Sequence, residues 1–118
     1  MTESEKFNIS SKNVDGINCI YLRGYLDAHT APVLETSIDT LLKSGNYKII
    51  VNFRDLEYIS SAGLGVFMSF IEEVREKGGD IKLSNMKTKV FSVFDLLGFP
   101  LLFDIENEES EAIGKFFR

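Results

Sequence analysis

A buried strand that leads into a helix constrains this chain more than any other feature. The strand is an apolar run, Ile49 to Phe53, whose length and β-branched content are typical of a strand buried on both faces. A polar break follows at Arg54 and Asp55, and Ser60 and Ser61 then precede a helical pattern. Free backbone N–H groups and the positive end of the helix dipole meet at such a helix start. A serine there can cap the helix, and its oxygen is well placed to carry a phosphate.

The same serines and glycines also have a purely structural interpretation, which the spacing alone favours. Ser60 or Ser61 can be an ordinary N-cap, and Gly63 and Gly65 can serve only for close packing of a helix on a sheet. Two kinds of chemistry are excluded by pattern. The G-x-S-x-G signature of a nucleophile elbow is absent, and Gly63 and Gly65 lack the third glycine of a dinucleotide-binding loop.

Length and charge limit the possible partners. A chain of 118 residues, of which 44% are hydrophobic, predicts one domain over residues 1–118 with a real core. The formal net charge of −5 disfavours direct binding of nucleic acid and of anionic membrane surfaces. One cysteine, Cys19, excludes an intrachain disulfide and a multi-cysteine zinc site. No apolar run reaches the length of a membrane span, and Met1–Lys6 does not resemble a signal peptide. We therefore expect a cytoplasmic domain without membrane insertion.

The hydrophobic spacing and turn residues along the rest of the chain predict an α/β domain with a small mixed sheet covered by about four helices. Phe7–Lys12 and Ile17–Leu22 are expected to form an antiparallel hairpin around a turn at residues 13–16. Asp80–Ser84 is a further strand, so that Ile49–Ser84 is a β-α-β unit with parallel strands and a right-handed crossover. A short apolar segment, Leu101–Ile105, adds a possible strand.

Helix starts and apolar stripes complete this prediction. Thr30 is expected to cap the first helix, Ser84 or Asn85 the third, and Asn107 the last. The expected apolar stripe of the third helix consists of Val90, Phe91, Phe94 and Leu97, and that of the last helix of Ala112, Ile113, Phe116 and Phe117. We expect the last helix to dock on the core, because an exposed pair of phenylalanines would be a liability.

The predicted functional surface lies at the carboxyl ends of two strands, where ligands and partners of α/β sheets tend to bind. The two loops there are Tyr25–Thr30 and Arg54–Ser61. If their strands are neighbours, Asp27, His29, Ser60 and Ser61 form one exposed patch. His29 is the only histidine and cannot form a metal site alone, and no nucleophile–base pair can be assembled. We therefore expect a binding surface and not an enzyme, with no catalytic residue, metal or cofactor.

Two motifs resemble those of a known family. The first is Asp55-Leu56-Glu57-Tyr58-Ile59-Ser60-Ser61-Ala62-Gly63-Leu64-Gly65, and the second is Gly24-Tyr25-Leu26-Asp27 followed by Thr30-Ala31-Pro32. Both resemble the STAS domain family and, more narrowly, the bacterial anti-sigma factor antagonists. The resemblance covers nearly the whole chain, and it implies a small sheet covered by helices.

The resemblance also implies a mechanism and a site. The phosphoacceptor serine of the family falls on Ser61, with Ser60 as second choice, because Ser60 replaces the usual aspartate before it. The unphosphorylated domain would bind an anti-sigma factor serine kinase and so release a sigma factor, and a serine phosphatase would reverse the phosphorylation. The implied partner-binding residues are Asp27, His29, Thr30, Ser60, Ser61, Ala62, Gly63 and Leu64.

Three other functions remain open at this point. The first is a STAS adaptor that is not phosphorylated and works in a scaffold or a lipid-transport complex. The second is a weak nucleotide-binding protein that uses Gly63-Leu64-Gly65 near a phosphate, although no Walker lysine is present. The third is a soluble anion sensor, suggested by STAS domains attached to anion transporters.

Overall fold

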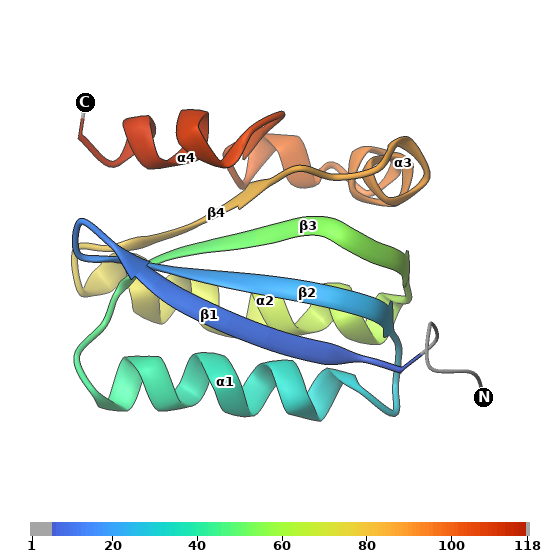
Figure 1. Ribbon diagram of the computed structural model, residues 1–118, viewed down its shortest axis with the longest axis horizontal. Helices are drawn as coiled ribbons and strands as arrows, with labels where there is room; N and C mark the ends of the chain where they lie inside the picture. Colours follow the sequence, from blue (N-terminus) through green and yellow to red (C-terminus); the bar gives the residue numbers. More distant parts are fainter. Residues whose placement is uncertain (1–5, 118) are drawn as a thin grey trace.

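The computed structural model describes residues 6–117, in which an N-terminal pair of strands is followed by helices and further strands in turn (Figure 1). In chain order the elements are β1 (Asn8–Val14), β2 (Ile17–Leu26), α1 (Ala31–Lys43), β3 (Lys48–Ile59), α2 (Ser61–Glu76), β4 (Asp80–Ser84), α3 (Thr88–Leu96), the 3-10 helix η2 (Phe99–Leu101), β5 (Ile105–Glu106) and α4 (Glu109–Lys115).

The strands form one mixed five-stranded sheet in the order β1-β2-β3-β4-β5. β1 pairs with β2 antiparallel, and the other three pairs are parallel. The hairpin closes through Asp15 and Gly16, whose φ angles of 53° and 87° fit a two-residue turn with the twist of the strands. The predicted mixed sheet and its antiparallel N-terminal hairpin are therefore confirmed.

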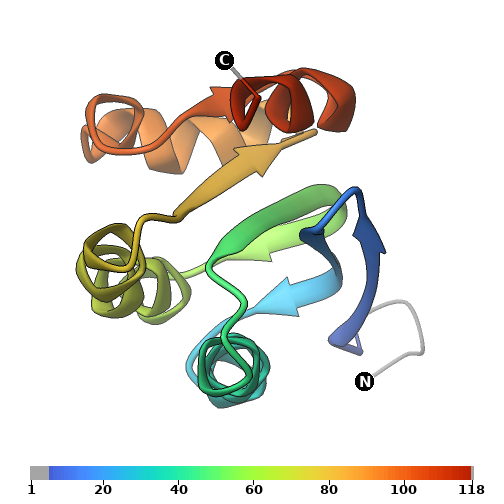
Figure 2. The same ribbon diagram turned by 90° about the vertical axis from the view of Figure 1, so that its left-hand side faces the viewer.

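The two faces of the sheet are covered unequally. The main core lies on the face that carries α1 and α2, with α3 joining it toward the β4 edge. A smaller cluster on the opposite face joins Ile17, Cys19 and Ile50 to Ala112 of α4. Figure 1 shows α1 and α2 below the sheet and α4 above it, and Figure 2 shows the same layers from the side. The arrangement follows from right-handed crossovers, which place successive helices on one face of a parallel sheet.

Phenylalanine fills the part of the core between α2, α3 and η2. The ring of Phe53 lies 5.8 Å from Phe67 and 5.4 Å from Phe94, measured between ring centroids. The row continues from Phe94 to Phe99 at 5.2 Å and on to Phe103 at 5.5 Å. Such aromatic pairs add to the stability that burial provides, so this row holds the C-terminal part of the domain to the sheet.

β2 and β3 are longer than the sequence predicts. β2 continues to Leu26 and β3 continues to Ile59, so the first two residues of the predicted loop Tyr25–Thr30 and most of the predicted loop Arg54–Ser61 are strand. The polar pair Arg54 and Asp55 interrupts the hydrophobic pattern but not the pairing, because register shifts at two points let β3 remain paired with β2. The prediction of a loop over Arg54–Ser61 is therefore wrong for Arg54–Ile59, which belongs to β3.

The predicted caps of the later helices are also wrong. Ser84 is the last residue of β4 and is fully buried, and Asn85 has a φ of 61°, so neither starts a helix. α3 starts after Lys87. Glu108, and not Asn107, precedes α4, and its N–H donates to Oε1 of Glu111 at 3.0 Å.

The apolar stripes are only partly buried. In α4, Ala112 is buried and Ile113 and Phe116 pack against the small cluster, which confirms docking, but Phe117 is 63% exposed. In α3, Val90 and Phe94 are buried, whereas Phe91 is at the surface and Leu97 is 56% exposed.

Candidate functional site

The ends of β2 and β3 lie side by side and bring the two motifs together. Leu26 pairs with Ile59 in the parallel ladder, and the N–H of Ser60 donates to the carbonyl oxygen of Leu26 at 2.9 Å. The turn at residues 27–30, before α1, therefore adjoins the start of α2. This is the adjacency that the predicted patch requires.

The turn before α1 is held by hydrogen bonds between Asp27 and Thr30. Oδ1 of Asp27 accepts from the N–H of His29 at 2.9 Å and from that of Thr30 at 3.2 Å. Oγ1 of Thr30 accepts from the N–H of Asp27 and donates to the carbonyl oxygen of Tyr25, both at 2.8 Å. The hydroxyl of Thr30 thus points back into the turn and does not cap α1, contrary to the prediction. His29 is left exposed at the tip.

Ser60 and Ser61 differ in access to solvent at the start of α2. Ser60 is the N-cap residue, in an extended conformation, but its side chain makes no capping hydrogen bond. Its Oγ is buried and has no hydrogen-bond partner among residues 6–117. Ser61 is the first residue of the 16-residue helix and is exposed. The capping interpretation therefore does not hold for Ser60, and Ser61 carries the accessible hydroxyl.

Gly63 lets the first turn of α2 sit directly on the strand ends. A Cβ atom at Gly63 would lie 2.8 Å from Cγ of Leu26 and 3.0 Å from Cγ1 of Ile59, which is closer than side chains tolerate. A Cβ at Gly65 would meet nothing within 4 Å. The packing interpretation therefore holds for Gly63 and not for Gly65.

The predicted partner-binding residues lie together but at different depths. His29, Ser61 and Ala62 are exposed, and Asp27, Thr30 and Ser60 are half-buried. Gly63 and Leu64 are buried, and Leu64 belongs to the main core. These last two residues set the position of the surface and do not form its outer layer.

Two further groups beside this surface are not predicted by the sequence. Tyr25 and Tyr58 are register partners on β2 and β3, 40% and 48% exposed, with ring centroids 5.7 Å apart. Glu57 accepts hydrogen bonds from Nζ of Lys87 at 2.9 Å and of Lys89 at 3.0 Å, and these bonds hold the pKa of Glu57 below its usual value. Both groups depend on strand register and on contacts across some 30 residues of sequence, for which the chain has no local signal.

A family model matches nearly the whole of this chain. Residues 8–112 match the family model described as the STAS domain. This chain belongs to the STAS domain family. The resemblance seen in the two motifs is thereby confirmed.

Relatives of this STAS domain cover nearly its whole length. The anti-sigma-B factor antagonist of Bacillus subtilis is 30% identical over 106 residues, which make up 90% of this chain and 96% of that protein. A protein of Thermotoga maritima has a structure with a TM-score of 0.83 at 26% identity, covering 93% of this chain and 95% of that one. The anti-sigma factor antagonist SpoIIAA in its unphosphorylated form gives a TM-score of 0.79 at 27% identity, with 92% and 96% coverage. The Bacillus SpoIIAA has also been solved in its phosphorylated form, with a TM-score of 0.71.

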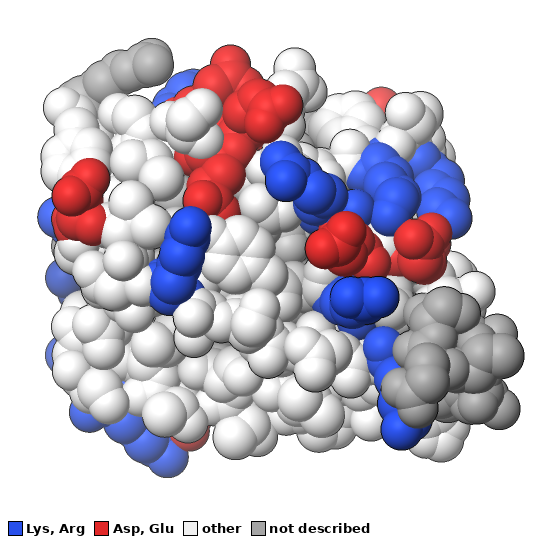
Figure 3. All heavy atoms as spheres, viewed as in Figure 1, with Lys and Arg blue, Asp and Glu red and all other residues white. Residues whose placement is uncertain are grey.

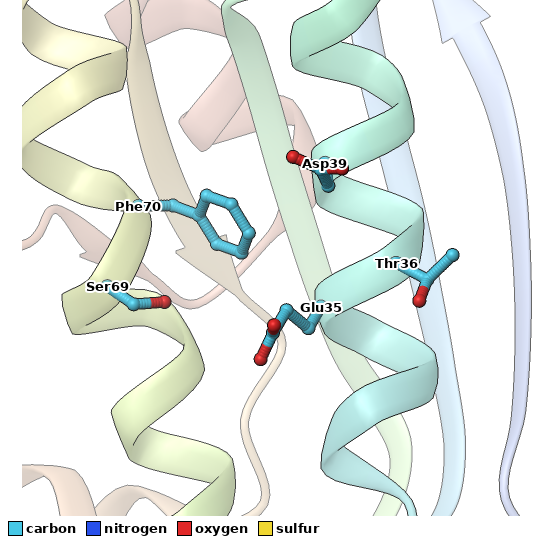
Figure 4. A pocket seen from close by; sticks show the side chains of 5 residues that line it. All are labelled: Glu35, Thr36, Asp39, Ser69 and Phe70. Carbon is cyan, nitrogen blue, oxygen red and sulfur yellow. The ribbon is translucent and has the colours of Figure 1, made fainter.

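An open hollow of this STAS domain lies between two helices, away from the serines. It is an open space of about 350 Å³ between α1 and α2, lined by Glu35, Thr36, Asp39, Ser69 and Phe70. Figure 4 shows Glu35 and Phe70 reaching from the two helices toward the space between them. The residues that line the hollow include two carboxylates and no basic side chain.

The surface carries charge of both signs. In the view of Figure 3, acidic side chains gather in one area near the top, and basic and acidic side chains lie beside one another further to the right. Within residues 6–117, no group of three or more His, Cys, Asp or Glu side chains is arranged to hold a metal ion. In the same part of the chain no helix has the length and hydrophobicity needed to cross a bilayer.

Proposed function

We propose that this STAS domain is an anti-sigma factor antagonist whose partner is an anti-sigma factor serine kinase. The unphosphorylated domain binds the kinase and releases a sigma factor, phosphorylation of Ser61 ends the binding, and a serine phosphatase restores it. The observation that carries the proposal is the exposed Ser61 hydroxyl at the first position of α2, on a surface built from both family motifs. Relatives that are anti-sigma factor antagonists support it, as do the structures of SpoIIAA in its unphosphorylated and phosphorylated forms.

The position of Ser61 suits a reversible charge switch. A phosphate adds about −1.5 to −2 charges and three acceptor oxygens. At the start of a helix the free N–H groups and the dipole favour an anion, so the fold tolerates the modification. A partner surface that fits a neutral hydroxyl does not, because like-charge repulsion and desolvation oppose the contact. A penalty of about 1.4 kcal/mol already weakens binding tenfold.

Exposure favours Ser61 over Ser60 as the acceptor. Oγ of Ser60 is buried between the strand ends and the helix, so a kinase would have to open the start of α2 to reach it. Ser61 needs no such opening. The interaction surface then consists of Ser61, Ala62 and His29, with Asp27 and Thr30 shaping the neighbouring turn.

The binding test uses two substitutions at Ser61. Ser61→Ala is expected to bind the anti-sigma factor kinase persistently in the presence of ATP, and Ser61→Asp to bind it at least about tenfold more weakly. The matched control is Ser110→Asp, which puts the same charge on another exposed serine in the first turn of a helix. Equal affinity of the two Ser61 variants, measured by calorimetry, would contradict the switch.

Phosphopeptide mass spectrometry on the protein from its own cells identifies the acceptor. Phosphate on Ser61, with an occupancy that changes between growth and stress, is the expected result. Phosphate on Ser60 would keep the switch and move the acceptor. Absence of phosphate under every condition would point to a constitutive adaptor instead.

A further inference from the structure

The start of α2 carries backbone donors that no protein acceptor uses. Among residues 6–117, none of the N–H groups of Ser61, Ala62 and Gly63 donates a hydrogen bond to the protein. The first N–H of α2 with a partner is that of Leu64, which donates to the carbonyl oxygen of Ser60 at 3.1 Å. Gly63 is itself buried, so one of the three unpaired donors lies beneath the surface of the molecule.

Oγ of Ser60 is a fourth group without a partner at the same place. It is buried, it does not cap α2, and within the described part of the chain it forms no hydrogen bond. A buried polar group without a hydrogen bond costs free energy. We call this hydroxyl and the N–H groups of Ser61, Ala62 and Gly63 the α2 donors.

The start of α4 shows what the start of α2 lacks. Glu108 and Glu111 form a capping box there, and Glu109 and Glu111 put negative charge into the first turn. α2 is more than twice as long, yet its first turn has neither a side-chain cap nor an acidic residue. Its unpaired N–H groups and the positive end of its dipole are therefore not compensated by the protein.

The adjacent turn does not supply the missing acceptor. Oδ1 of Asp27 accepts from the N–H groups of His29 and Thr30, so this carboxylate is engaged within its own turn. An acceptor for the α2 donors has to come from elsewhere, and the exposed hydroxyl of Ser61 is the point at which one can be attached.

We infer that a phosphate on Ser61 caps α2 by accepting hydrogen bonds from the α2 donors. A phosphate brings three acceptor oxygens and about −1.5 to −2 charges, and at a helix start it can form one to three charge-assisted hydrogen bonds. Ser60 is then a positioning residue, whose hydroxyl reaches the phosphate by rotation about its Cα–Cβ bond. The inference rests on the proposed function for the place of the phosphate. It goes further in that the modification stabilises the domain and is not merely tolerated.

Thermal unfolding of the domain with phosphoserine at position 61 tests the inference. Phosphoserine inserted during translation makes a kinase unnecessary, so the result does not depend on how Ser61 is modified in cells. The melting temperature is expected to rise by about 3–6 °C at neutral pH. The matched control is phosphoserine at position 110, in the first turn of α4, where the cap is present and two acids repel the phosphate. There the melting temperature should stay the same or fall, and an equal rise at both positions would contradict a role of the α2 donors.

Two variants at Ser60 test its part in holding the phosphate. Ser60→Ala should reduce the rise caused by phosphoserine by about 2 °C or more, because one donor is lost. Ser60→Asp should abolish the rise, because its carboxylate takes the same N–H groups and repels the phosphate. Each variant is compared with its own unmodified form, so a change in basal stability cancels. A full rise in both variants would overturn the role of Ser60.

Nuclear magnetic resonance reads the hydrogen bonds directly. The amide protons of Ala62 and Gly63 should move downfield when Ser61 carries phosphate, and they should move much less in Ser60→Asp. Unchanged amide shifts together with an unchanged melting temperature would overturn the inference and leave the switch intact, because the switch is judged by kinase binding. A rise in melting temperature in a domain whose Ser61→Ala and Ser61→Asp variants bind the kinase equally would support the inference and contradict the switch.

Discussion

Gly63 and Leu26 are in such close contact that no side chain fits between them. A Cβ at Gly63 would lie 2.8 Å from Cγ of Leu26, which is itself fully buried and cannot move away freely. Gly63→Ala is therefore expected to lower the free energy of unfolding by about 1–3 kcal/mol, as overpacking does. Gly65→Ala, at an open position of the same helix, should raise it by about 0.5–1 kcal/mol. Urea denaturation measures both, and equal effects would show that the close approach has no energetic cost.

The unused cap at Ser60 predicts that an aspartate there stabilises the domain. Ser60→Ala should change the free energy of unfolding by less than about 0.5 kcal/mol, because the buried hydroxyl makes no hydrogen bond. Ser60→Asp should raise it by about 0.5–1 kcal/mol at neutral pH, by accepting from the first-turn N–H groups. Those bonds lower the folded pKa of the new carboxyl, so the gain is present above about pH 4 and is lost as the pH falls through the folded pKa. Thermal unfolding at pH 7 and near pH 3 provides the comparison.

Asp104 stabilises the buried ammonium of Lys82. Lys82 is 6% exposed and donates to Asp104 at 2.7 Å and to Asp80 at 2.9 Å. Asp104→Asn should cost about 1–2 kcal/mol at pH 7, a reduced figure because the carboxyl is itself 41% exposed. The hydrogen bond from Lys82 lowers the pKa of Asp104, so this contribution is complete above the unfolded pKa of about 4 and disappears at lower pH. The exposed Asp95→Asn is the control, and a difference that does not vary with pH would exclude the ion pair as the cause.

Glu109 fixes α4 over the buried thiol of Cys19. Its carboxylate accepts from the hydroxyl of Tyr21 at 3.0 Å and from Nδ2 of Asn52 at 3.2 Å. Burial, with the nearby charge of Glu109, raises the pKa of Cys19 to about 11, so the thiol should react slowly in the native protein. Glu109→Ala leaves two donors unpaired at a cost of about 1–3 kcal/mol and should speed labelling of Cys19 by Ellman's reagent about tenfold or more. Ser110→Ala, its exposed neighbour, should leave the labelling rate unchanged. Equal rates in the two variants would mean that α4 opening does not limit access.

The existence of the elements was predictable from the sequence where hydrophobic spacing was strong, but their ends were not. β3 was predicted from Ile49 to Phe53, yet the strand continues for six residues because backbone pairing with β2 persists through Arg54 and Asp55. Backbone hydrogen bonds do not depend on side-chain hydropathy, so a polar pair can be part of a strand without interrupting it. Ser84 has the residue type of a helix cap, but its backbone pairs with Asn52 and it ends β4.

The position of the candidate site could be predicted from the sequence to the extent that it depends only on which strands are neighbours. The two motifs meet because β2 and β3 are adjacent and parallel, so Asp27 and Ser61 were correctly placed at one edge. The different depths of Ser60 and Ser61 were not, since they depend on how closely α2 approaches Leu26. The Tyr25–Tyr58 pair and the lysines on Glu57 required the register and the position of α3, which no local pattern encodes.

Among residues 6–117, α4 is the helix that covers the second face of the sheet, and its late position in the chain matters for biosynthesis. The helices that follow β2, β3 and β4 close the first face as each crossover emerges, but Cys19 and Ile50 must wait for α4, some 60 residues after Ile50. A nascent chain that has left the ribosome as far as β5 therefore contains all residues of the main core, but its apolar residues Ile17, Cys19 and Ile50 on the other face of the sheet are still exposed. The thiol of Cys19 would report the moment at which these residues are covered, because it becomes unreactive only when α4 arrives.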